Sequence, residues 1–110
     1  MTVNEYQSLA RRTQPDYETN EERAFHAVFG LCSEAGEVAG LLQKKYQGHT
    51  VDSEHMVREL GDCLWMISEA CDAFGVTMEM VMLKNITKLQ ERYPDGFDAE
   101  RSLHRKEWDI

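Results

Sequence analysis

The segment Phe29–Lys44, FGLCSEAGEVAGLLQK, decides the fold class. Apolar residues recur in it every three or four positions, which is the spacing of one face of an α-helix. The same periodicity extends back to about residue 20 and on to about Tyr46. A second periodic segment leads to Phe74, and no stretch alternates between apolar and polar residues as a half-buried strand does. The sequence therefore predicts an all-α protein.

Helix-capping residues divide the chain into four main helices. Thr2 with Glu5, and Thr19 with Glu22, have the spacing of a capping box, in which two side chains satisfy free backbone N–H groups at a helix start. We expect helices over about 3–13, 20–46, 53–74 and 78–93. The connection between the two long helices is short, which favours antiparallel packing. The expected fold is a bundle of four main helices with the two long central ones antiparallel.

Length and charge limit the classes of function. A chain of 110 residues is enough for one core, and we expect a single helical domain over 1–97. The polar tail, 98–110, is expected to form a short helix or an arm that contacts a partner. A net charge of −8 disfavours binding to nucleic-acid polymers or anionic membranes. No apolar run is long enough to cross a membrane and the N-terminus lacks the pattern of a signal peptide, so a cytoplasmic protein is expected.

Two pairs of acids interrupt the long helical segments. Glu34 and Glu37, and later Glu59 and Asp62, are spaced three residues apart, so each pair lies on one side of its helix. On a helical wheel each pair lies off the apolar stripe that we assign to the core. These stripes are Phe25, Val28, Phe29, Cys32, Ala35, Ala39 and Leu42, and Val57, Leu60, Cys63, Leu64, Ile67, Cys71 and Phe74. Antiparallel packing is expected to place all four carboxylates on one wall.

Four carboxylates without histidine favour a hard divalent cation. Magnesium, or alternatively manganese, prefers such oxygen ligands. The four histidines are scattered, so a zinc site is not expected, and the Glu-x-x-His motif of di-iron bundles is absent. The alternative is that the acids only form a solvated helix face.

A cationic ridge is expected on the fourth helix. Lys84, Lys88 and Arg92 recur every fourth residue, with Asn85 and Tyr93 as neighbouring uncharged donors. Such a ridge is typical of a solvated face, but beside a metal it would also suit a polyphosphate. Trp65 follows Asp62 by one turn, and its ring is available either to fill the core or to stack on a base.

Three motifs carry a resemblance to a known family. The segments SEAGEVAGLLQK, RELGDCLW and NITKLQERYPDGF, in this order, resemble the all-α nucleoside triphosphate pyrophosphohydrolases of the MazG type, including their compact members. The resemblance covers about residues 3–97. The family pattern is EExxE followed by ExxD, and Glu34, Glu37, Glu59 and Asp62 fill four of its positions. Ser33 stands where the first acid of the doublet is expected, which leaves the number of metal ions open.

The resemblance implies a reaction and a partner. A nucleoside triphosphate would be hydrolysed between its α and β phosphates, with magnesium held by the four acids, one of which would also take the proton of the attacking water. Lys84, Asn85, Lys88 and Arg92 would bind the phosphates, and family members are dimers or pairs of dimers. Two alternatives stay open, namely a phosphoribosyl-ATP pyrophosphohydrolase and a catalytically silent helical dimer that binds nucleotides or a protein partner.

Overall fold

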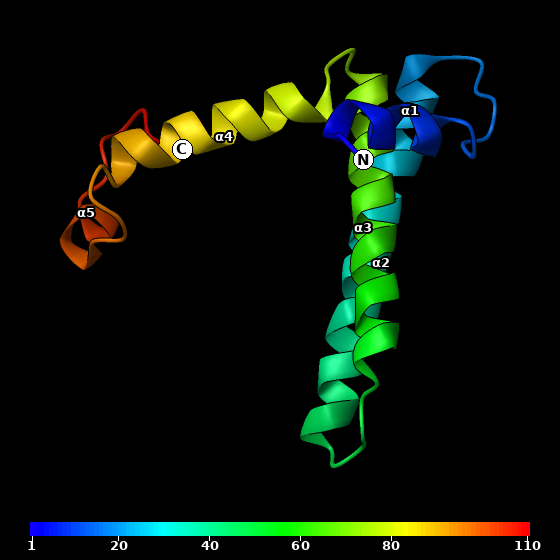
Figure 1. Ribbon diagram of the computed structural model, residues 1–110, viewed down its shortest axis with the longest axis horizontal. Coiled ribbons are helices and arrows are strands. Elements are labelled where there is room, and N and C mark those ends of the chain that lie inside the picture. The colour runs from blue at the N-terminus through cyan, green and yellow to red at the C-terminus, as the bar shows by residue number, and fades with distance from the viewer. The chain divides into compact units, whose positions relative to one another are not determined.

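The computed structural model describes all 110 residues and is all-α, with 70% of the chain in helices. This confirms the fold class. Four main helices and one short one follow each other without an intervening strand (Figure 1). Their bounds are α1 Val3–Arg11, α2 Asn20–Tyr46, α3 Ser53–Ala73, α4 Met78–Arg92 and α5 Ala99–Leu103.

Side-chain caps begin the first three helices, and the two at Thr2 and Thr19 were predicted. Thr2 and Glu5 form the complete capping box at the start of α1. At α2, the Thr19 side chain accepts the Glu22 N–H as expected, but the Glu22 carboxylate accepts from the backbone of Glu18 instead of returning to Thr19. Asp52 caps α3 by accepting the Glu54 N–H. Local signals therefore place these helix starts correctly.

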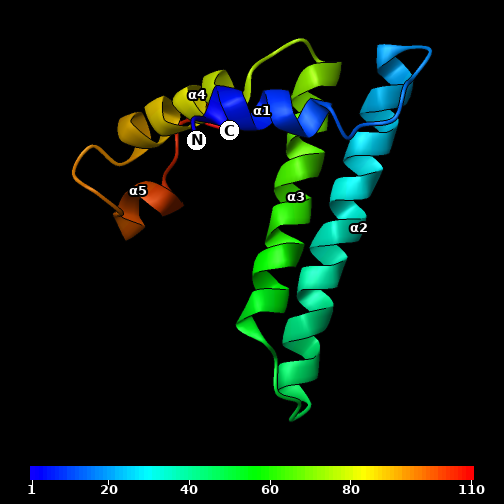
Figure 2. The same cartoon turned by 45° about the vertical axis from the view of Figure 1, so that its right-hand side comes forward.

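The two long helices, α2 and α3, lie side by side and antiparallel, as Figures 1 and 2 show. Small residues line their contact, with Ala27 fully buried. A Cβ atom at Gly30 would lie 2.4 Å from Met66 Sδ, so the glycine gives space to that side chain. Residues 47–52 reverse the chain, where Gly48 adopts a φ of 96° that favours glycine. The hairpin positions every acid of the two pairs.

The expected core stripe is wrong for the isolated chain. Its large members are between 44% and 69% exposed, namely Phe25, Val28, Phe29, Leu42, Val57, Leu60, Leu64 and Phe74. The buried apolar residues of the hairpin are Ala27 and Leu41, which lie outside the expected stripe, and Cys71, which belongs to it. The reason is that small residues let the two helices approach closely along another face, which leaves the larger apolar side chains uncovered by this chain.

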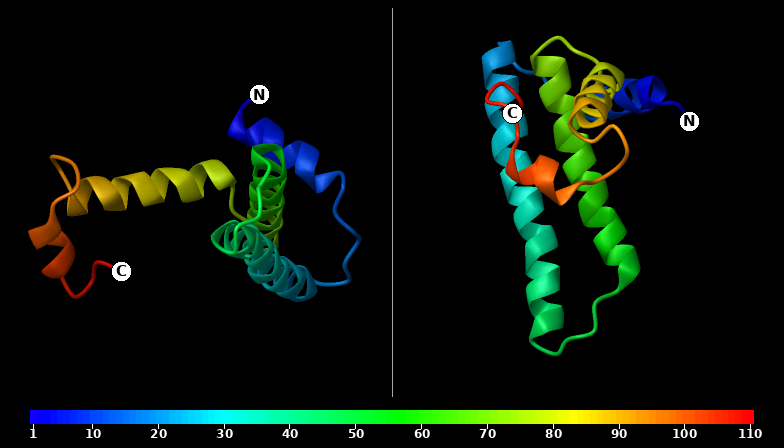
Figure 3. Two further views of the ribbon diagram at one scale, coloured as in Figure 1. Left: turned by 90° about the horizontal axis from the view of Figure 1, so that it is seen from below. Right: turned by 90° about the vertical axis from the view of Figure 1, so that its left-hand side faces the viewer.

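The first helix packs on α3 and forms with the hairpin one compact unit, residues 1–78. The second unit, residues 79–110, contains most of α4, the turn at Pro94–Gly96 and α5 (Figure 3). Within the tail, Ala99–Leu103 forms the expected short helix, and Asp98 caps it. The boundary at residue 97 stays a prediction.

No helix in the structure is both long enough and apolar enough to span a bilayer.

Candidate metal centre and phosphate-binding residues

Three of the four predicted acids meet between the long helices. Glu34 comes from α2, and Glu59 and Asp62 come from successive turns of α3. One carboxylate oxygen of each lies within 4.8 Å of the corresponding oxygens of the other two. Glu34 and Glu59 are half-buried and Asp62 is exposed, so the group opens to solvent on one side. Such an arrangement can hold one cation among three oxygen ligands.

No lysine or arginine neutralises this group. None of its three carboxylates forms an ion pair with a lysine or an arginine. Burial raises the pKa of Glu34 above 4.5, and the charges of Asp62, Glu59 and Glu37 add to the increase. Crowded carboxylates repel one another and hold a proton more tightly than an isolated acid does. A divalent cation would remove this repulsion.

Glu37 lies outside the group of three. It is exposed, as is the neighbouring Ser33. Its charge nevertheless contributes to the raised pKa of Glu34, one turn away on α2. The structure therefore brings together Glu34, Glu59 and Asp62, and leaves Glu37 at the edge of the same wall.

Two neighbours of the acids were missed from the sequence. His55 Nε2 lies 3.0 Å from Glu59 Oε1, four residues away on the same helix. The i, i+4 spacing of His55 and Glu59 is the sequence signal for this contact. Tyr6 on α1 is close enough for the charge of Asp62 to add to the effect of burial, and both raise the pKa of its phenol. Because α1 and α3 are far apart in the sequence, no local pattern indicates this neighbour.

A polar cluster lies further along α3, beyond Trp65. The Trp65 indole N–H donates to Thr13 Oγ1 at 2.8 Å, and its ring meets the ring of His26 edge-on. Glu69 is fully buried and accepts from Tyr17 Oη at 3.0 Å, and His26 Nδ1 lies 2.5 Å from the same oxygen. The second oxygen of Glu69 has no hydrogen-bond partner. The sequence signal for this cluster is an acid inside an apolar run.

The predicted phosphate-binding residues all lie in the second unit. Lys84 and Asn85 are exposed, whereas Lys88 and Tyr93 are half-buried. Arg92 is largely covered, because its guanidinium makes a two-pronged ion pair with Asp109 of the tail. The same guanidinium lies 5.8 Å from the centre of the Tyr93 ring. The cationic ridge is therefore divided into an exposed part and a part that contacts the tail.

The donor set fits a hard divalent cation. Three carboxylate oxygens converge from two helices, and the raised pKa of Glu34 reflects uncompensated negative charge. Oxygen ligands of this kind suit magnesium or manganese, which keep several water ligands of their own. His55 contacts Glu59 and is placed to orient that carboxylate.

A known protein family matches the segment that carries these acids. Residues 26–97, more than half of the chain, match the sequence model of the family described as MazG nucleotide pyrophosphohydrolase domain. The Gene 37 protein of Mycobacterium phage L5 is 29% identical over 76 residues, which are 64% of this chain and 67% of the phage protein. No solved structure matches the chain. The matched segment contains the acids of both helices, and the chain belongs to the MazG nucleotide pyrophosphohydrolase family.

Proposed function

We propose that the protein hydrolyses nucleoside or deoxynucleoside triphosphates to the monophosphate and pyrophosphate with the help of magnesium. The observation that supports this most directly is the meeting of Glu34, Glu59 and Asp62 without a basic partner. Family membership supports the reaction class. A role in cleaning or limiting the nucleotide pool of the cytoplasm would follow from this activity.

Each acid has a proposed role. Glu34, Glu59 and Asp62 hold magnesium, and Glu37 at the edge of the group completes the set of four. Magnesium held by these acids would offset phosphate charge and make water a better nucleophile. One of the carboxylates accepts the proton of that water, for which the raised pKa of Glu34 is favourable.

The basic residues of α4 are proposed to bind the phosphate chain. Lys84, Lys88 and Arg92 would offset the charge that develops on the leaving pyrophosphate. Asn85 and Tyr93 would donate uncharged hydrogen bonds. Arg92 already donates to Asp109, so phosphate binding by Arg92 requires exchange of that partner. Trp65, which is half-buried, is the proposed stacking surface for the base.

A homodimer or homotetramer is proposed as the working form. The uncovered stripe is apolar and lies on α2 and α3, the same two helices that carry the acids. Large exposed apolar patches mark protein interfaces in soluble proteins. A second copy packed on this stripe would bury it and complete the bundle.

The family domain is proposed to cover 1–97, with 98–110 as a tail.

The experiment is a measurement of pyrophosphate release from a panel of nucleoside and deoxynucleoside triphosphates, with and without magnesium. Glu37→Gln and Asp62→Asn are compared with Glu54→Gln, a control on the exposed start of α3. We expect magnesium-dependent turnover that both site variants lower by at least about tenfold and the control leaves unchanged. Turnover unaffected by both site variants contradicts the metal assignment. Binding of nucleotides without any turnover would indicate a silent module.

A further inference from the structure

One largely buried ion pair holds the C-terminal tail against α4. Arg92 Nε and Nη2 lie 2.8 and 2.6 Å from the two carboxylate oxygens of Asp109. Only 11% of the Arg92 side chain and 9% of the Asp109 side chain are exposed. Hydrogen bonding from Arg92 lowers the pKa of Asp109, and the charges of Arg105 and Lys88 add to this effect. The end of the tail therefore has a fixed place in the second unit.

The tail and α4 line a partly open cavity of about 410 Å³, which is in the size range of small-molecule sites. Its basic lining residues are Lys88, Arg92, Arg101, Arg105 and Lys106. Two acids, Glu91 and Asp109, also line it, so five positive and two negative charges give a net charge of +3 before His104 is counted. The whole chain has a net charge of −8, so positive charge is concentrated here.

Most of this positive charge has no internal partner. Arg92 is neutralised by Asp109, but Lys88, Arg101, Arg105 and Lys106 form no ion pair. The Lys106 ammonium lies 5.3 Å from the centre of the Trp108 ring, which attracts the cation without cancelling its charge. Cations that face one cavity repel one another unless an anion enters it.

We propose that this tail cavity binds the phosphate chain of a polyphosphate, either free pyrophosphate or the phosphates of a nucleotide. The arginine guanidinium offers two parallel N–H groups that match two phosphate oxygens, and the lysines add point charges. An isolated monoanion would satisfy only part of the net charge of the lining. The proposal goes beyond the proposed reaction, because binding of phosphates by the tail needs neither magnesium nor turnover.

The test is a calorimetric titration of the full chain with inorganic pyrophosphate, with a chelator present so that no divalent cation contributes. The variant Arg101→Ala/Arg105→Ala removes two cations from the cavity. Lys44→Ala/Lys45→Ala removes the same charge from exposed positions at the end of α2 and is the matched control. We expect the cavity variant to weaken pyrophosphate binding by at least about tenfold, because charge-assisted hydrogen bonds are lost, and the control to leave it within about twofold.

Two further variants keep the test decisive if the alanine variant misfolds. Arg101→Lys/Arg105→Lys retains the charge without the guanidinium fork and is expected to bind with intermediate affinity. Asp109→Asn weakens the attachment of the tail and is expected to lower affinity although it makes the chain less negative. Absence of pyrophosphate binding by the wild type, or equal weakening in the cavity variant and the lysine control, overturns the proposal.

The same variants separate the two sources of phosphate. If the cavity holds substrate phosphates, Arg101→Ala/Arg105→Ala raises KM for the nucleoside triphosphate and leaves kcat nearly unchanged. If it holds free pyrophosphate or a separate nucleotide, pyrophosphate binding is lost while KM stays constant. The titration does not depend on turnover, so a protein that hydrolyses no nucleotide would refute the proposed reaction and leave this test intact.

Discussion

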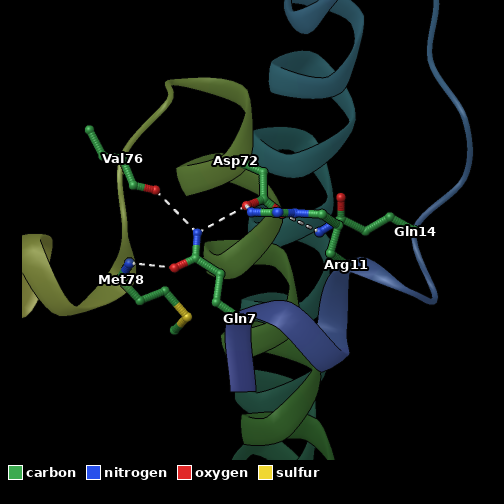
Figure 4. A network of polar contacts seen from close by, with 6 residues as sticks. All are labelled: Gln7, Arg11, Gln14, Asp72, Val76 and Met78. Atoms are coloured by element: carbon green, nitrogen blue, oxygen red, sulfur yellow. Dashed lines mark hydrogen bonds and ion pairs between the residues drawn. The ribbon is translucent and has the colours of Figure 1, made fainter. Parts of the chain in front are cut away.

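Gln7 Nε2 donates to Asp72 Oδ1 at 2.9 Å and so joins α1 to the end of α3 (Figure 4). The same amide nitrogen donates to the Val76 carbonyl at 3.1 Å, and the amide oxygen accepts the Met78 N–H at 2.8 Å. Gln7 is buried, with 4% of its surface exposed. One side chain therefore satisfies three groups around the turn that leads into α4.

Replacement of Gln7 by alanine is expected to lower the free energy of unfolding by about 2 kcal/mol, because buried polar groups lose their partners. Urea unfolding followed by circular dichroism measures this change. Ser8→Ala, at an exposed position on the same helix, is the control and should stay within about 0.5 kcal/mol of the wild type. Gln7→Leu should be no more stable than Gln7→Ala. Equal stability of Gln7→Ala and Ser8→Ala would contradict the role of this amide.

Stability in acid is expected to depend on Asp72. Burial alone would raise the pKa of Asp72, but hydrogen bonds from Arg11, Gln7 and Gln14 and the charge of Arg11 outweigh it, so the pKa falls below 3.8. A carboxylate with a lowered folded pKa stabilises the fold fully above the unfolded pKa, and this contribution disappears as the pH falls through the folded pKa. Urea midpoints should therefore drop below about pH 3.8, and Asp72→Asn should flatten that dependence. A slope unchanged in Asp72→Asn would contradict the assignment.

The helix starts and ends were predictable because they depend on residues close in sequence. The Thr2–Glu5 capping box and the Asp52 cap each involve groups at most three positions apart. The stop after α3 is equally local, since Gly75 adopts a φ of 68° and the following Val76 N–H bonds back to the Cys71 carbonyl. No knowledge of packing is needed for such features.

The helix faces that pack against each other were not predictable in the same way. A helical wheel shows where large apolar residues gather, and it correctly groups Phe29 with Val28 and Leu42. It does not show which chain covers them. Ala27 and Gly30 permit close approach of α3 on a different face, so the large residues stay exposed in one chain. The meeting of Glu34 with Glu59 and Asp62 depends on the antiparallel pairing itself, which the short connection did indicate.

Glu34→Gln is expected to have opposite effects with and without magnesium. Burial and three neighbouring acids raise the pKa of Glu34, so its charge opposes folding at neutral pH, and removal of the charge should stabilise the metal-free protein. Magnesium at ten times its dissociation constant should stabilise the wild type by about 1.4 kcal/mol and the variant much less. Thermal unfolding with magnesium or a chelator measures both effects, with Glu54→Gln as the control. A variant that keeps the full magnesium effect would exclude Glu34 as a ligand.

Phe29→Asp is expected to dissociate the proposed oligomer. Phe29 is 69% exposed in the single chain and stacks on Phe25 within the uncovered stripe. A charge placed in an apolar interface loses its hydration without gaining a partner, which strongly opposes association. Light scattering at micromolar concentration should give at least twice the chain mass of 12.7 kDa for the wild type and the single-chain mass for the variant. Gln43→Asp adds the same charge at another exposed position of α2 and should remain associated. A monomeric wild type would contradict the prediction.

Alkaline pH is expected to destabilise the fold through Tyr17. Burial, together with the hydrogen bond to Glu69 and the charge of Glu69, raises the pKa of Tyr17 from 10.0 to about 12. The unfolded chain loses this proton near 10.0 while the folded chain keeps it, so the contribution to stability is complete below 10.0 and is lost as the pH rises to about 12. The absorbance difference between wild type and Tyr17→Phe should show ionisation near 12, and Glu69→Gln should move it downward. Tyr46→Phe, at an exposed position, should leave that late transition in place. If Tyr17→Phe instead removed absorbance that develops near pH 10.0, the contact between Tyr17 and Glu69 would not hold in solution.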